Sequence, residues 1–188
     1  MITSLVLFDA KLASMNKENY QLALQAGSLL QAQSSSVGVA ESCTGGGIAQ
    51  ALTAVPGSSE WFQLGLVTYS NVMKKRYLDV PSECLEGPGA PGAVSEQTVR
   101  HMVTGILAAA DADYAVACSG IAGPGGGSPD KPVGTVWLAW ASRKGNDVQI
   151  TARVFQFAGD RESVRQQTVM QSLQGLVDCC QASLNNNQ

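Results

Sequence analysis

The chain of 188 residues suits one compact domain, and its 45% hydrophobic and 14% charged residues exclude an intrinsically disordered protein. Its formal net charge of −3 gives no basic field that would hold nucleic acid. No apolar stretch reaches the roughly 18–20 residues that cross a bilayer, and the first ten residues make a poor signal peptide. Its five cysteines include no Cys-x-x-Cys pair, which argues against a disulfide framework or a zinc ribbon. We therefore expect a cytoplasmic protein without membrane or nucleic-acid partners.

The sequence predicts helices and strands that alternate along the chain. In order, we predict a helix over 16–33, a strand over 36–40, a helix over 48–54, a strand over 64–69, helices over 71–78 and 95–110, strands over 114–119, 133–141 and 148–157, and a last helix from Asp160. Residues 1–15 are expected as an irregular N-terminal extension of a single domain that covers 1–188. This order predicts an α/β sandwich with a mixed sheet, with ligands at the carboxyl ends of its strands.

The single histidine limits the chemistry that the chain can perform. His101 falls inside the helix predicted over 95–110, where we interpret it as a structural or surface residue. A histidine-rich metal site is therefore not expected, and a Ser-His-Asp triad would depend on His101 alone. Nucleophilic catalysis would more readily use a lysine or a tyrosine as its base.

The segment Glu41–Gly47 places a small hydroxyl residue between a strand and a glycine-rich helix start. Ser42 is a candidate nucleophile there, and Cys43 is an alternative that would point the opposite way along an extended chain. Backbone amides at this helix start would favour an anion or an oxyanion. The alternative interpretation is an N-cap turn without chemistry.

Two further segments carry polar groups at strand ends. Thr68–Lys75 holds a phenol, Tyr69, and two amines, and its alternative interpretation is a solvated basic turn. Gly120–Ser128 resembles a loop that cradles phosphate with consecutive amides, and Lys131 would add a charge. It is not a Walker A loop, because no Gly-Lys-Ser/Thr follows, and a flexible surface turn is the alternative.

Five segments in one order resemble the family of the CinA C-terminal domain, which includes stand-alone nicotinamide mononucleotide deamidases of the PncC type. They are Ala40-Glu-Ser-Cys-Thr-Gly-Gly46, Val67-Thr-Tyr-Ser-Asn71, Gly92-Ala-Val-Ser-Glu96, Ser119-Gly-Ile-Ala-Gly-Pro124 and Lys131-Pro-Val-Gly-Thr-Val136. The resemblance spans about residues 36–178. It implies a three-layer α/β/α fold, often in homo-oligomers, and hydrolysis of the nicotinamide mononucleotide carboxamide without a metal or cofactor.

The resemblance also implies site residues. Ser42 corresponds to the nucleophile, Tyr69 to the family tyrosine, and Lys74 rather than Lys75 to the family lysine, by its spacing from that tyrosine. We expect Lys74, assisted by Tyr69, to deprotonate Ser42 for attack on the amide carbonyl. We expect the remaining substrate contacts at two loops, namely Thr44, Gly45, Gly46, Gly123, Gly125, Gly126 and Lys131. Three rival interpretations remain: a nucleotide-binding regulatory module without hydrolysis, a structural or oligomerisation domain, and an amidase for another substrate.

Overall fold

The computed structural model describes residues 2–185, and the side-chain environments of residues 17–185. The helices are α1 (Ile2–Ala32), α2 (Gly47–Thr53), α3 (Asn71–Leu78), α4 (Ser82–Leu85), α5 (Glu96–Ala109) and α6 (Arg161–Asn185), with one 3-10 turn, η1 (Ser58–Glu60). The strands are β1 (Val37–Glu41), β2 (Phe62–Val67), β3 (Tyr114–Gly120), β4 (Thr135–Lys144) and β5 (Asp147–Gln156).

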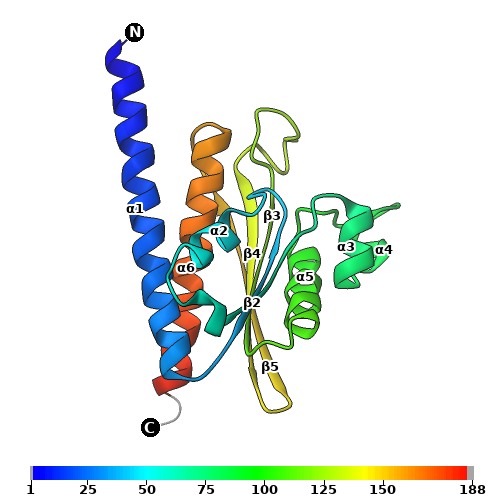
Figure 1. Cartoon of the computed structure of the whole chain (residues 1–188). Helices are drawn as coiled ribbons and strands as arrows, with labels where there is room; N and C mark the ends of the chain where they lie inside the picture. Colours follow the sequence, from blue (N-terminus) through cyan, green and yellow to red (C-terminus); the bar gives the residue numbers. More distant parts are fainter. Residues whose placement is uncertain (1, 186–188) are drawn as a thin grey trace.

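The five strands form one mixed sheet in the order β2-β1-β3-β4-β5. β1 pairs in parallel with both β2 and β3, whereas β4 and β5 pair antiparallel to their neighbours. Helices α1, α2 and α6 cover one face of the sheet, and α3, α4 and α5 lie on the other (Figure 1). The predicted three-layer α/β/α fold with a mixed sheet is thus confirmed.

Parallel pairing brings three loops to one edge of the sheet. Because β1, β2 and β3 run in the same direction, the segments that follow Glu41, Val67 and Gly120 all begin at the same edge. Strand β1, which lies between β2 and β3, is buried along its whole length, as is most of β3, and this explains their continuous apolar sequences. This edge holds the segments in which the sequence predicted chemistry.

Two predicted helix starts are confirmed by their N-caps. The Ser95 side chain accepts a hydrogen bond from the Thr98 amide at the start of α5, and Asp160 accepts one from the Ser163 amide at the start of α6. The hairpin between β4 and β5 turns at Gly145, whose φ of +60° suits the first central position of a type II′ turn.

The N-terminal segment corrects one prediction. Helix α1 begins at Ile2, so the expected irregular extension over 1–15 is wrong for residues 2–15, and residue 1 lies outside the described residues. Neither glycine nor proline occurs between Ile2 and Ala26, so nothing in the sequence stops the predicted helix from continuing toward the N-terminus. Strand β2 also lies two residues earlier than predicted. Within residues 2–185, no helix is both long enough and apolar enough to cross a membrane.

Candidate active site

The structure pairs Ser42 with Lys74. Ser42 directly follows β1, and the Lys74 Nζ lies 3.1 Å from the Ser42 Oγ and 2.8 Å from the Thr68 carbonyl oxygen, to both of which it donates. Only 1% of Lys74 and 8% of Ser42 is exposed. Burial lowers the pKa of Lys74 from its usual 10.5, since the charged amine loses its water. A lysine that more readily becomes neutral, beside a serine hydroxyl, has the geometry that a general base needs to activate a serine nucleophile.

Helix α3 decides which lysine reaches the serine. The helix begins after Ser70, whose hydroxyl accepts a hydrogen bond from the Met73 amide. From this start Lys74 points inward, whereas the amine of Lys75 lies 3.3 Å from the Glu86 carboxylate at the partly exposed surface. The geometry thus brings Lys74, and not Lys75, to Ser42.

A buried carboxylate occupies the start of helix α2. The side chain of Glu41, only 1% exposed, accepts hydrogen bonds from the amides of Gly46, Ile48 and Ala49 at 2.8–3.0 Å. The Gly45 amide donates to the Ser42 carbonyl. The prediction that amides here face a bound anion is therefore corrected for Gly45 and Gly46, because the protein's own groups already accept from them. The sequence signal that could have predicted this role of Glu41 is its position as an acidic residue shortly before a helix start.

Cys43 and Thr44 point away from the Ser42–Lys74 pair. Cys43 is buried in the apolar layer beneath α1, α2 and α6, and its hydrogen bond with Cys118, together with burial, holds the pKa of its thiol well above the usual value. A thiol held protonated is a poor nucleophile. The Thr44 side chain is fully buried, with its Oγ1 3.1 Å from the Cys118 Sγ. Of the two candidate nucleophiles, only Ser42 forms a hydrogen bond with Lys74.

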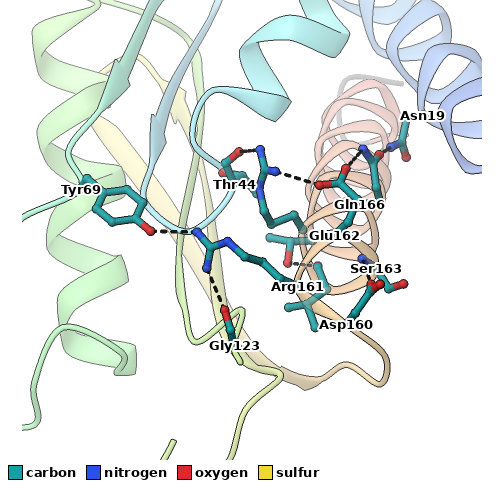
Figure 2. Close-up of polar contacts among 12 residues, drawn as sticks. Asn19, Thr44, Tyr69, Gly123, Asp160, Arg161, Glu162, Ser163 and Gln166 are labelled. Carbon is teal, nitrogen blue, oxygen red and sulfur yellow. Dashed lines mark hydrogen bonds and ion pairs between the residues drawn. The ribbon is translucent and has the colours of Figure 1, made fainter. Parts of the chain in front are cut away.

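Arg161 joins the loop after β2 to the loop after β3. Its guanidinium donates to the Tyr69 hydroxyl and to the Gly123 carbonyl, both at 3.0 Å (Figure 2). Tyr69 is 58% exposed, and its carbonyl, rather than its hydroxyl, accepts from Lys74 at 3.4 Å. The predicted assistance of Lys74 by the Tyr69 phenol therefore has no direct contact behind it. Sequence reasoning missed Arg161, because only the topology brings the first residue of α6 to this edge.

The glycine-rich loop after β3 is largely exposed. Gly125 and Gly126 lie in solvent, whereas Gly123 is buried with φ +81°. The Lys131 amine donates to the Pro91 carbonyl at 2.6 Å and so ties this loop to the Gly/Pro-rich segment before α5. The Lys131 amine thus has a partner within the protein, and its contact with a phosphate stays a prediction.

The single histidine and the acidic and cysteine side chains do not form a metal site within residues 2–185. His101 lies exposed on α5, in agreement with its interpretation as a surface residue. Over residues 2–185, no three His, Cys, Asp or Glu side chains gather in an arrangement that could hold a metal ion.

Comparison with known proteins identifies the family. The sequence model of the CinA C-terminal domain matches residues 19–180. The chain belongs to the CinA C-terminal domain family. The nicotinamide-nucleotide amidohydrolase PncC of Pseudomonas putida is 54% identical over 156 residues, 83% of this chain and 93% of that protein. The protein of the same name from Escherichia coli K12 is 50% identical over 161 residues, 86% of this chain and 94% of that protein.

Solved structures of CinA proteins share the fold. The competence/damage-inducible protein CihA of Agrobacterium tumefaciens superposes with a TM-score of 0.80 at 41% identity, covering 86% of this chain and 94% of that one. A CinA superfamily protein of Klebsiella pneumoniae gives a TM-score of 0.80 at 38% identity, covering 87% and 98%. The resemblance read from the sequence motifs is therefore confirmed.

Proposed function

We propose that this chain is an amidase that hydrolyses the carboxamide of nicotinamide mononucleotide to nicotinic acid mononucleotide and ammonia. The observation that carries the proposal is the buried contact of 3.1 Å between the Lys74 amine and the Ser42 hydroxyl. Relatives named for this activity match most of this chain and of their own length, which supports the choice of substrate.

The proposed reaction is acyl transfer in two steps. Neutral Lys74 takes the Ser42 proton as Oγ attacks the carboxamide carbon, and the tetrahedral intermediate collapses when Lys74 returns that proton to the leaving nitrogen. Ammonia departs and leaves an ester on Ser42. Water then attacks the ester, gives its proton to Lys74, and Lys74 reprotonates Ser42 as the carboxylic acid leaves. The proton count closes without a metal or a cofactor.

Arg161 is the proposed contact for the nucleotide phosphate. Its guanidinium reaches the Tyr69 hydroxyl and the Gly123 carbonyl in the loops that begin at the same sheet edge as Ser42, and its planar donors match the geometry of a phosphate. In this arrangement the Tyr69 hydroxyl positions Arg161 at the entrance of the proposed substrate site. Lys131 anchors the glycine-rich loop by its hydrogen bond to the Pro91 carbonyl.

Ammonia release from nicotinamide mononucleotide in EDTA tests the proposal. The wild-type protein should release ammonia, and Ser42→Ala should release it about a thousandfold more slowly or not at all, because the acyl acceptor is gone. Ser28→Ala, which changes an exposed serine on α1, is the matched control and should keep full activity. Undiminished turnover in Ser42→Ala would remove Ser42 from the mechanism. No release by the wild type, with thermal stabilisation by the nucleotide, would favour the regulatory binding module.

A further inference from the structure

The first turns of helix α6 contact all three loops that follow the parallel strands. Arg161 donates hydrogen bonds to the loops after β2 and β3. One turn later, the Arg165 guanidinium donates to the Thr44 carbonyl at 2.9 Å, in the loop after β1. Residues four apart lie on the same face of a helix. One face of α6 therefore meets the three loops at the edge of the sheet where Ser42 lies.

Two helices orient the Arg165 side chain. Its Nη1 donates to the Glu162 carboxylate at 2.9 Å, and its Nη2 donates to the Thr44 carbonyl. The second carboxylate oxygen of Glu162 accepts from Gln166 at 2.8 Å, and Gln166 accepts from Asn19 of α1 at 3.0 Å (Figure 2). Because a guanidinium is planar, a carboxylate bound at one nitrogen also fixes the direction of the other nitrogen. Helices α1 and α6 together thus direct Arg165 toward the loop after β1.

The carbonyl that Arg165 binds lies two residues after Ser42. The residue before Ser42 is Glu41, whose side chain is fixed by hydrogen bonds from three amides at the start of α2. Ser42 therefore lies between two anchored residues, Glu41 and Thr44, whose partners come from different helices. Loss of one anchor lets the loop shift, and a misplacement of about 1 Å between reacting groups costs roughly a hundredfold in rate.

We propose that Arg165 is a positioning residue, which holds the Thr44 carbonyl and so keeps the Ser42 Oγ 3.1 Å from the Lys74 amine. This role rests on the proposed function, because the serine that it serves is the proposed nucleophile. Arg165 donates to Glu162 and to the loop backbone, so its effect on Ser42 passes through the loop. Removal of its guanidinium should lower the reactivity of Ser42 and leave the affinity for substrate nearly unchanged.

Labelling of Ser42 by an alkyl fluorophosphonate measures this reactivity without the nucleotide. The Ser42 Oγ attacks phosphorus, an O–P bond forms, the P–F bond breaks, and the Ser42 proton passes to Lys74 as fluoride leaves. Intact mass against time gives the labelling rate, and Ser42→Ala shows that the label is on this residue. In Arg165→Met, which has no donors, labelling should slow about tenfold or more. In ammonia-release kinetics, kcat should fall by a similar factor while KM changes less than about twofold.

Arg100→Met is the matched control for a general loss of stability. Like Arg165, Arg100 donates to a carboxylate of its own helix, that of Glu96 at 2.8 Å, and to a backbone carbonyl of another element, that of Ile150 at 3.2 Å. It lies on α5 and should label at the wild-type rate. Thermal unfolding shows whether each variant is folded at the assay temperature. Arg165→Lys keeps the charge and one donor, so it is the milder variant and should label at an intermediate rate.

The labelling rates separate the positioning role from the proposed activity. The positioning role is overturned if Ser42 is not labelled in the wild type, if the Arg165 variants label at the wild-type rate, or if Arg100→Met slows labelling equally. A raised KM with an unchanged kcat in Arg165→Met would also overturn it, because Arg165 would then act in substrate binding. Slow labelling of Arg165→Met, with no ammonia release by the wild type, would support the positioning role and refute nicotinamide mononucleotide as the substrate.

Discussion

At the scale of single residues, burial gives the Lys74 amine the property that its proposed role as a base requires. An exposed lysine stays charged at neutral pH and cannot accept a proton. Lys74 is 1% exposed, and its amine donates to the Thr68 carbonyl and the Ser42 hydroxyl. Because burial disfavours the charged form, the pKa of Lys74 lies below 10.5 and the neutral amine is accessible at lower pH.

The sign of the pH dependence follows from this pKa. Turnover should rise with pH as Lys74 loses its proton, with the basic inflection below the usual lysine value of 10.5. The measurement is kcat against pH by ammonia release. Lys74→Met should abolish turnover over the whole range, whereas Lys75→Gln should leave the profile unchanged because Lys75 pairs with Glu86 at the surface. A profile that falls with pH in this region would contradict the role of Lys74 as base.

At the scale of elements, Glu41 and helix α2 support each other. The helix has seven residues and a glycine N-cap without a side-chain hydrogen bond, so its first amides need another acceptor. The carboxylate of Glu41 supplies it from the end of β1, and so fixes the loop that contains Ser42 between two anchored ends.

Replacing this carboxylate should therefore destabilise the fold. In Glu41→Gln, the side-chain NH₂ group would face backbone N–H donors, and the free energy of unfolding should fall by roughly 2–4 kcal/mol. Urea denaturation measures this change. Glu83→Gln, at an exposed position in α4, is the control and should change stability by less than about 0.5 kcal/mol. Equal stability of the two variants would show that Glu41 is not the acceptor that holds α2.

Helices α3 and α5 meet at a glycine. A Cβ added at Gly105 of α5 would lie 2.7 Å from the Leu78 Cα and would clash with the Leu78 carbonyl, at the end of α3. Only a residue without a side chain allows this contact, and α3 is the helix that carries Lys74.

Gly105→Ala should thus act on both stability and activity. Displacement of α3 should lower the free energy of unfolding by about 1–3 kcal/mol and reduce kcat, since Lys74 moves away from Ser42. Thr104→Ala, at an exposed position of the same helix, is the control. Thermal unfolding and ammonia release measure the two effects. An unaltered kcat with reduced stability would mean that α3 keeps its place without the close contact.

At the scale of the whole molecule, Arg161 joins segments that are far apart in the sequence. It begins α6 and reaches the loops that follow β2 and β3, 92 and 38 residues earlier in the chain. The mouth of the proposed site therefore depends on the docking of the C-terminal helix against the sheet.

Removal of this guanidinium should weaken substrate binding more than chemistry. Arg161→Met should raise KM for nicotinamide mononucleotide about tenfold, with a smaller change in kcat, because it loses a phosphate contact but leaves Ser42 and Lys74 paired. Steady-state kinetics measure both constants. Arg153→Gln, on the exposed strand β5, controls for loss of a positive charge. A KM equal to that of the wild type would place the phosphate elsewhere.

The sequence by itself determined the order of elements, the mixed α/β fold, the family, and the candidates Ser42 and Lys74. These depend on local signals, namely apolar periodicity, glycine and proline positions and short motifs, which act over a few residues. The tertiary structure decided what those groups contact. Glu41 accepts the hydrogen bond of an amide that was expected to face an anion. The Tyr69 hydroxyl accepts from Arg161 rather than contacting Ser42 or Lys74, and the Lys131 amine donates to the Pro91 carbonyl. These groups are far apart in the sequence and meet only when the folded sheet brings the ends of its strands together. The number of residues between two groups does not determine how close they lie in the folded chain.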